Sequence, residues 1–378
     1  MKHPLKWVEI SEERVLHNAQ EAKRCLNGQT ELAAVVKANA YGHGMELTAS
    51  ILDSRNAVDA FAVFDVPEAE KLRAAGIKRK ILILGYITPD DCEAVAELEL
   101  TPFIYSTEIL DPLNSAAEKN SRKIRVLIKA DTGMGRLGVK QTTLPAILEL
   151  TKNTPFVEPA GFATHFACSD DESREKTDSQ SARFRKLVDE HKSLLAPPLQ
   201  NCAANTGGIL LYPETHYDIV RFGIGLYGFY PSEFVRKTSS ASLKPVLEYK
   251  TRIIHIQKLQ KGNSVSYGST WTAEKDTTIA VLPVGYADGY IRAFSNRAHV
   301  LVNGRKAPVR GRVCMDMTMV DITGIENVHP GTEATVISSD TDSGCTADDL
   351  AKLADTINYE ITTIIPPNIP RFSDSVMQ

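Results

Sequence analysis

The feature that most constrains the fold is an alternation of short apolar runs with helical patterns over the first two thirds of the chain. Eight runs read as buried strands because they are short, apolar and bounded by turn residues; they cover residues 32–36, 60–64, 80–84, 101–104, 124–129, 160–163, 199–202 and 218–221. Amphipathic patterns such as Pro67–Ala75 and Gln180–Leu195 separate them. Such alternation is typical of parallel strands, and eight units favour a closed (β/α)8 barrel of the TIM type. An open doubly wound sheet is the alternative.

The pattern changes after about residue 240, where short β-like runs follow one another with turn signals between them. These runs cover residues 249–259, 279–284, 298–302, 307–312, 318–322 and 333–338. Asn303-Gly304 is typical of a two-residue hairpin turn, and a helix is expected over Ala347–Thr362 with Thr346 as its cap. We therefore predict two domains: a barrel over residues 11–240 and a mainly β domain over residues 241–378.

Composition excludes several classes of protein. The 378 residues carry a net charge of -4 and are 43% hydrophobic, so neither nucleic acid nor an anionic membrane is an expected partner. The N-terminus lacks the apolar core of a signal peptide, and no apolar run is long enough to span a membrane. We expect a cytoplasmic protein. The six cysteines have no CxxC spacing, so neither a disulfide framework nor a metal site is expected.

One stretch could carry covalent chemistry, namely the run Ala34-Val-Val-Lys37-Ala-Asn-Ala-Tyr41-Gly-His43-Gly44. It places Lys37 at the end of a buried strand, before glycines that let the backbone turn sharply. A lysine that is desolvated on one side has a lowered pKa and is a candidate Schiff-base nucleophile. The alternative is a lysine whose amine simply reaches water.

Polar, glycine-rich loops follow the later strands. They are residues 129–138, 164–166, 204–208 and 221–228, which contain Arg136, His165, Thr206 and Arg221. Glycines and hydroxyls suit a phosphate held by backbone N–H groups, and the arginines suit a carboxylate or a ring nitrogen. Ordinary turn chemistry and a core histidine are the alternatives. No GxGxxG or GxxxxGK[ST] pattern is present, which disfavours a dinucleotide or nucleoside triphosphate site.

Together these motifs resemble the alanine racemase family, which uses pyridoxal phosphate. The resemblance runs in register from about residue 5 to residue 372. It rests on the Lys37 stretch and on residues 131–138, 221–228, 266–271, 285–289, 311–316 and 356–361. It implies a (β/α)8 barrel followed by a β domain, with residues 1–10 packed against the β domain.

The resemblance also implies the catalytic roles. Lys37 would form the internal aldimine with pyridoxal phosphate, and Tyr267 would be the second base. Two bases are expected on physical grounds, since one lysine below the ring cannot readily serve both faces of the substrate. An ordinary tyrosine has a pKa of about 10, so its anion needs support, which the family assigns to His165 and Arg221. Arg221 would also face the pyridine nitrogen.

The remaining site residues are carried over in the same way. By resemblance, the cofactor is bound by Tyr41, His165, Asn205, Thr206, Arg221, Gly223, Ile224 and Tyr359. Arg136 and Met315 would hold the substrate, and Lys129 matches a position that is carbamylated in some members. Two positions depart from the family pattern: Thr206 replaces the usual serine, and Asn368 replaces an arginine near the C-terminus.

The resemblance implies an obligate homodimer in which Tyr267 and Met315 complete the partner's site. The expected reaction is interconversion of L-alanine and D-alanine, a step that supplies D-alanine for peptidoglycan precursors. Three alternatives stay open: a serine or broad-specificity racemase, a related decarboxylase, and a carrier of pyridoxal phosphate without catalysis. A decarboxylase is disfavoured by Arg221, because that class favours an acidic partner for the ring nitrogen.

Overall fold

The computed structural model describes residues 4–140 and 142–377. The chain forms two compact units. One contains Leu16–Ala38 and Thr48–Leu243. The other contains the described residues up to Val15, the short segment Asn39–Leu47 and the described residues from Lys244 onward. The chain therefore crosses from the first unit to the second after Ala38 and returns after Leu47.

The first unit is built on a parallel sheet with the strand order β7-β6-β5-β4-β3-β2-β8. These strands are β2 (Glu31–Val35), β3 (Ala60–Val63), β4 (Lys80–Ile83), β5 (Leu100–Ile104), β6 (Ile124–Lys129), β7 (Val157–Ala163) and β8 (Ile219–Phe222). Cys202 bridges β7 through Ala163 and β8 through Ile219, both in parallel, which closes the ring. The predicted eight-stranded barrel is confirmed, and the open sheet is wrong.

The strand predicted at residues 199–202, the seventh of the barrel, is reduced to these two bridges at Cys202. Its backbone still pairs with β7, because Gln200 N–H donates to Ala160 O at 2.9 Å and Cys202 N–H donates to Phe162 O at 2.8 Å. Pro197 and Pro198 come just before and have no N–H to offer. The pairing with β7 is therefore interrupted between Ala196, whose N–H donates to Pro159 O at 2.7 Å, and Gln200.

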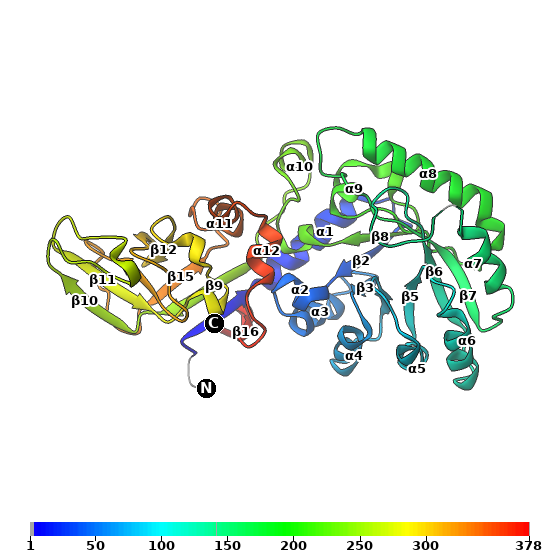
Figure 1. Cartoon of the computed structure of the whole chain (residues 1–378), viewed down its shortest axis with the longest axis horizontal. Coiled ribbons are helices and arrows are strands. Elements are labelled where there is room, and N and C mark those ends of the chain that lie inside the picture. Colours follow the sequence, from blue (N-terminus) through cyan, green and yellow to red (C-terminus); the bar gives the residue numbers. More distant parts are fainter. Residues whose placement is uncertain (1–3, 141, 378) are drawn as a thin grey trace. The chain divides into compact units, whose positions relative to one another are not determined.

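Helices cover the outside of the barrel (Figure 1). They are α1 (Glu12–Cys25), α3 (Met45–Ser54), α4 (Val66–Ala74), α5 (Cys92–Glu97), α6 (Leu110–Lys119), α7 (Leu144–Thr151) and α8 (Glu175–His191), with the shorter α9 (Thr206–Leu211) and α10 (Glu233–Thr238) near the end of the unit. The strands read as nearly continuous apolar runs because they are buried on both faces, as in β3, where all four residues are buried.

The second unit contains two sheets. The larger has the order β13-β12-β15-β9-β1-β16 and the smaller β10-β11-β14. The strands are β1 (Lys6–Ile10), β9 (Leu247–Arg252), β10 (His255–Leu259), β11 (Thr277–Leu282), β12 (His299–Val302), β13 (Arg305–Pro308), β14 (Thr318–Asp321), β15 (Glu333–Ile337) and β16 (Arg371–Ser373). β1 lies between β9, with which it is antiparallel, and β16, with which it is parallel. Helices α11 (Ala347–Ala354), α12 (Asn358–Thr363) and α13 (Asp374–Met377) also belong to this unit.

The hairpin predicted at Asn303-Gly304 is confirmed. β12 and β13 pair antiparallel up to Val302 and Arg305. Asn303 and Gly304 both have positive φ, 49° and 71°, as a type I′ turn requires.

Two elements predicted as continuous are interrupted. The run 249–259 forms β9 and β10 in different sheets, because Ile253 N–H donates to Thr332 O whereas Ile254 N–H donates to Val281 O. The helix predicted over 347–362 is α11 and α12. Thr346 caps α11 as expected, but Asp355 takes a left-handed conformation with φ 56° and ends that helix.

A short left-handed turn follows β2. Ala38, Asn39, Ala40 and Tyr41, within α2 (Lys37–Tyr41), have φ between 52° and 54°. L-residues lose roughly 1–2 kcal/mol each in such a helix, so the surroundings must stabilise it. Gly42 follows with φ 87°, and a Cβ there would lie 1.9 Å from Thr362 O, which only glycine avoids.

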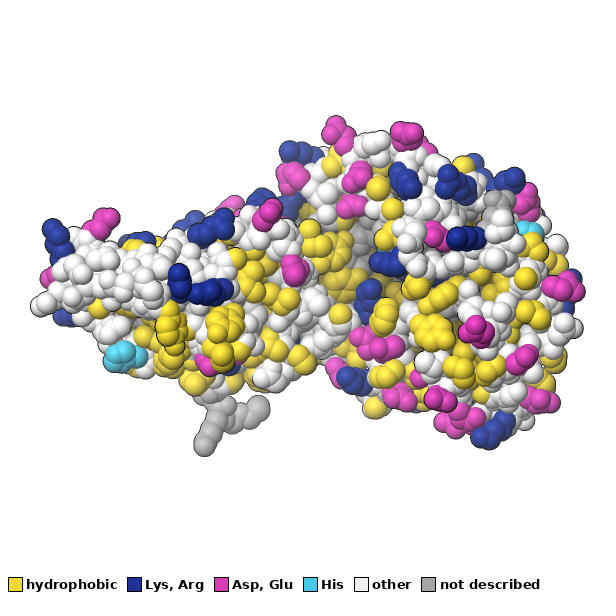
Figure 2. All heavy atoms as spheres, viewed as in Figure 1, with side chains coloured by type: hydrophobic (Ala, Val, Ile, Leu, Met, Phe, Trp, Pro, Cys, Tyr) yellow, Lys and Arg dark blue, Asp and Glu magenta, His cyan; other side chains and the backbone are white. Residues whose placement is uncertain are grey.

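Within the described ranges, no helix is long and apolar enough to cross a membrane. On the face that Figure 2 shows, basic and acidic side chains are interspersed, so neither sign of charge dominates that face.

Candidate functional site

Lys37 follows the end of β2 and is half-buried. Its Nζ lies 5.9 Å from the centre of the Phe64 ring. Burial lowers the pKa of Lys37, and the nearby charges of Arg136 and Arg221 lower it further, while Glu68 opposes them. A larger fraction of this amine is therefore neutral, and hence nucleophilic, than in an ordinary lysine.

Arg221, on β8, is a buried cation with neutral hydrogen-bond partners. Its Nη1 donates to Cys202 Sγ at 2.7 Å, and its Nη2 donates to Thr164 O at 2.8 Å. Nη2 also donates to Ala203 O at 3.1 Å. Among the described residues, this guanidinium thus bonds to carbonyl groups, a thiol and an imidazole. The arginine is held in place without a carboxylate bond that would neutralise its charge.

His165 is oriented by Arg221. Nη2 of Arg221 lies 3.1 Å from His165 Nδ1. Arginine can only donate, so Nδ1 must accept and the proton of the neutral imidazole lies on Nε2. Burial lowers the pKa of His165 well below its usual value, and the charge of Arg221 adds to this effect. His165 is therefore a neutral ring that presents an N–H donor at Nε2.

Lys129, the last residue of β6, is buried with a relative exposure of 7%. Burial lowers its pKa to about 8, with Arg221, Arg136 and Lys37 contributing. Four basic side chains from different barrel segments thus act on one another, namely Lys37, Lys129, Arg136 and Arg221. This end of the barrel is suited to an anionic ligand.

The loop that carries Arg136 is shaped by Asp131. The Asp131 carboxylate accepts backbone N–H bonds from Gly133, Met134 and Gly135 at 2.8–3.1 Å. Burial opposes ionisation, but these N–H groups lower the pKa of Asp131 below its usual value. The loop is therefore fixed by an ionised carboxylate, while Arg136 itself is exposed.

The hydroxyl and amide groups expected to hold a phosphate lie together. Thr206 Oγ1 accepts N–H bonds from Gly223 at 3.2 Å and from Gly225 at 3.4 Å. Asn205 caps α9 by accepting the N–H of Gly208 at 3.1 Å. Ile224 is buried. The loop that contains Thr206 and the loop that contains Gly223, which follow the seventh and eighth strands of the barrel, are therefore joined by hydrogen bonds.

The two tyrosines expected near the phosphate belong to the second unit and contact each other there. The ring centres of Tyr41 and Tyr359 are 5.9 Å apart, and the rings are tilted by 48°. Tyr41 extends from the left-handed turn, and Tyr359 lies in α12.

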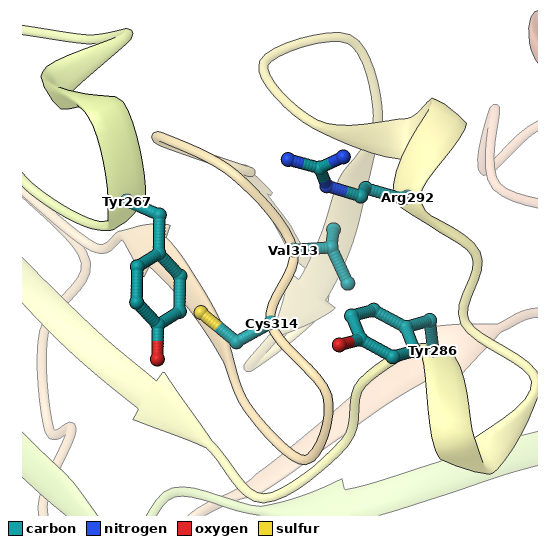
Figure 3. A pocket seen from close by; sticks show the side chains of 5 residues that line it. All are labelled: Tyr267, Tyr286, Arg292, Val313 and Cys314. Carbon is teal, nitrogen blue, oxygen red and sulfur yellow. The ribbon is translucent and has the colours of Figure 1, made fainter.

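The second predicted base lies in a pocket of the second unit. Tyr267, Tyr286, Arg292, Val313 and Cys314 line a space of about 450 Å³, and in Figure 3 the Tyr286 hydroxyl and the Cys314 thiol point toward the side on which Tyr267 lies. Tyr267 is 71% exposed. Such an exposed tyrosine can contact a molecule outside its own unit.

The loop that contains Met315 forms one wall of this region. The N–H groups of Tyr286 and Ala287 donate to Cys314 O and Met315 O, both at 3.0 Å. Met315 is 55% exposed. Arg292 was not singled out from the sequence; its only signal was its position three residues after the Gly285–Gly289 motif.

The donor set of the barrel fits pyridoxal phosphate. Lys37 offers a partly neutral amine for the aldehyde, and the joined loops of Thr206 and Gly223 offer a hydroxyl and backbone N–H groups of the kind that bind phosphate. Arg221 offers a donor to a ring nitrogen that carries no proton.

Comparisons with known proteins point to one family over nearly the whole chain. Residues 10–231 match the family described as alanine racemase, N-terminal domain, and residues 246–373 match alanine racemase, C-terminal domain. An alanine racemase of Carboxydothermus hydrogenoformans is 41% identical over 365 residues, which cover 97% of this chain and 98% of that protein. An alanine racemase of Clostridium perfringens is 40% identical, over 97% of this chain and 94% of that protein.

Solved structures give the same result. The alanine racemase of Clostridium difficile 630 superposes with a TM-score of 0.92 at 32% identity, over 99% of this chain and 97% of that chain. The alanine racemase of Bartonella henselae, solved with covalently bound pyridoxal phosphate, has a TM-score of 0.84 at 26% identity, over 98% of this chain and 100% of that chain.

Proposed function

The chain belongs to the alanine racemase family, and from this premise we propose that it interconverts L-alanine and D-alanine with pyridoxal phosphate. The observation that carries the proposal is the position of Lys37, half-buried just after β2 and close enough to Arg136 and Arg221 for their charges to lower its pKa. Chiral analysis of the product formed from L-alanine tests it.

We propose that Lys37 binds the cofactor covalently and that Tyr41, His165, Asn205, Thr206, Arg221, Gly223, Ile224 and Tyr359 hold it. When bound, pyridoxal phosphate supplies an electron-withdrawing system that acidifies the α-hydrogen of the amino acid. Arg221 cannot give up a proton near neutral pH, so a ring nitrogen held against it stays unprotonated. This limits electron withdrawal and so disfavours side reactions such as transamination.

Two bases divide the proton transfer. Lys37 serves one face of the substrate and Tyr267 the other, and each is an acid in one direction and a base in the reverse direction. The proton held on His165 Nε2 supports this assignment, because it could donate to the Tyr267 oxygen and stabilise its anion. Arg221 keeps His165 neutral and fixes its tautomer. Arg136 and the Met315 backbone would bind the substrate carboxylate.

We propose that Tyr267 and Met315 act in the site of a partner chain, so that the enzyme is a homodimer with two shared sites. A mixed dimer of Lys37→Ala with Tyr267→Phe tests this arrangement. It would contain one doubly altered site and one intact site, so about half of the wild-type activity is expected, because a two-fold dimer has two equivalent sites.

The two variants would be co-expressed with different tags, and the mixed dimer would be purified through both tags. Each single-variant dimer is the control and is expected to be nearly inactive. A mixed dimer as inactive as its parents would contradict shared sites, and a fully active wild-type monomer in sedimentation at assay concentration would also contradict them.

Lys129 is proposed to carry a carbamate. Reaction of its Nζ with carbon dioxide forms an N–C bond and releases a proton, and it requires a neutral amine. The pKa of about 8 makes that amine available near pH 8. The product would place a negative charge where it can orient Arg136. In ¹³C NMR with labelled bicarbonate, we expect a carbamate signal that disappears in Lys129→Gln and persists in Lys140→Gln, a change at an exposed lysine of the same region. A spectrum without that signal at pH 8 would refute the proposal.

Nothing in the comparisons favours a serine or broad-specificity racemase, and the relatives reported above are named for alanine. We retain as proposals that the enzyme acts in the cytoplasm and supplies D-alanine for peptidoglycan precursors. Rescue of a D-alanine auxotroph would test the latter role.

A further inference from the structure

We propose that Arg371 is a positioning residue for the cofactor site. It holds the left-handed turn that begins directly after Lys37 and carries Tyr41. This inference rests on the proposed function, because it assumes that Lys37 and Tyr41 bind pyridoxal phosphate.

The turn needs external support. Four successive residues without glycine, from Ala38 to Tyr41, have φ of 52–54°, and L-residues visit this region singly rather than in runs. Such strained backbone persists only where surrounding contacts determine it, and it is concentrated at functional sites.

Part of the support is internal to the turn. Asn39 accepts through its side chain from Met45 N–H at 3.0 Å and through its carbonyl from Gly44 N–H at 2.9 Å. His43 is fully buried, and its Nδ1 lies 3.0 Å from Ala40 O and 3.1 Å from Tyr41 O. Both partners are carbonyls, so Nδ1 carries the proton. Burial lowers the pKa of His43 to about 3, which keeps the ring neutral.

Two side chains from outside the turn also bond to it: Glu68 accepts the Ala38 N–H at 2.6 Å, and Arg371 holds the other end. Its Nε and Nη2 both donate to Gly42 O, at 3.2 and 3.1 Å. The same guanidinium also donates to two carbonyls that follow α12. Nη2 donates to Ile365 O at 2.9 Å, and Nη1 donates to Pro366 O at 2.6 Å. One planar fork therefore joins the end of the turn to the end of α12, and the point charge of a lysine cannot reproduce this pattern.

The same two segments carry the tyrosine pair. Tyr41 lies one residue before Gly42, and its ring contacts Tyr359 of α12. A Cβ at Gly42 would meet Thr362 O, also in α12, so the turn and the helix are in close backbone contact. Loosening the Gly42 carbonyl would release Tyr41 from Tyr359 and let the backbone next to Lys37 relax.

Arg371→Lys and Arg371→Met test the role, and Arg252→Lys and Arg252→Met are the matched controls. Arg252 lies in the same unit and likewise donates to a carbonyl, Gly331 O at 3.1 Å, and to Glu333 at 2.8 Å. Two readouts are used: hydrogen exchange of the peptide covering residues 38–45, and the Kd of the apo-protein for pyridoxal phosphate by absorbance titration.

For both Arg371 variants we expect exchange in residues 38–45 to become roughly tenfold faster, and Kd to rise roughly tenfold or more, because charge-assisted hydrogen bonds are lost. The Arg252 variants should change neither quantity. If Arg371→Met fails to fold, Arg371→Lys alone decides, since it retains the charge and most of the side chain.

Unchanged exchange in Arg371→Lys, or faster exchange with an unchanged Kd, would overturn the proposal. A wild-type protein that binds pyridoxal phosphate and racemises alanine would then leave the proposed function intact. A wild-type protein that binds no pyridoxal phosphate would overturn both.

Discussion

Lys37→Ala is expected to lower the rate of alanine racemisation by at least about 1,000-fold, because it removes both the covalent anchor of the cofactor and one of the two bases. Each of these losses alone would be severe. Bound pyridoxal phosphate, if any remains, should lose the absorbance of a lysine-linked cofactor. The measurement is the initial rate of D-alanine formation by chiral chromatography, with the visible spectrum recorded on the same sample.

Lys152→Ala is the control for this prediction. Lys152 is an exposed lysine of the same unit, paired with Glu149 at 2.5 Å. An exposed pair of this kind contributes little to stability, so its loss should leave the rate unchanged. Lys37→Ala protein that racemises alanine at a tenth of the normal rate or faster would exclude Lys37 as anchor and base.

Tyr267→Phe is expected to lower the rate by about 100- to 10,000-fold, the range typical of a lost general acid or base. The equilibrium constant between free enantiomers is one, so kcat/KM must fall equally in both directions. The difference between directions therefore appears in the isotope effects. Proton removal from L-alanine should become strongly rate-limiting, so α-deuterated L-alanine should show the larger increase in its primary isotope effect.

Tyr286→Phe is the matched control, because Tyr286 lines the same pocket and also loses only a hydroxyl. Its effect should be small beside that of Tyr267→Phe. Isotope effects that rise equally for the two deuterated enantiomers would count against the assignment of Tyr267 to the L-alanine face. An effect of Tyr286→Phe as large as that of Tyr267→Phe would make the two hydroxyls indistinguishable.

The barrel could be predicted because its signal is local. Each strand is a short apolar run between turns, as in residues 80–83, and parallel strands under helices need no alternation of polar residues. The strand at residues 199–202 follows from the same signal, but its reduction to two bridges at Cys202 does not, because those bridges depend on pairing with β7 and β8.

Elements set by distant contacts were the ones that the sequence did not reveal. The break between β9 and β10 arises because Ile253 and Ile254 bond to different partners, Thr332 and Val281. Nothing in the local pattern marks that switch. The left-handed turn is similar, since Ala38 and Ala40 are good formers of right-handed helix. Its conformation depends on contacts such as that between Arg371 and Gly42.

The candidate site, too, could be predicted from the sequence only in part. The residue types at Lys37, Arg221 and Thr206 could be read from strand ends and glycine-rich loops. The hydrogen bonds that hold Arg221 in place could not be read from the sequence. The thiol of Cys202 and the ring of His165 reach Arg221 only in the folded barrel. Assignment of Tyr267 needed the family resemblance, since an exposed tyrosine in a β domain carries no chemical signal of its own.

The most direct test of the central claim is chiral analysis of L-alanine and, in parallel, L-serine after incubation with the purified protein and pyridoxal phosphate. The account predicts that D-alanine forms fastest and that Lys37→Ala forms it at least about 1,000-fold more slowly. Faster formation of D-serine would retain the two-base mechanism and contradict the substrate. Absence of a D-product from either amino acid, with cofactor bound, would contradict the proposed activity itself.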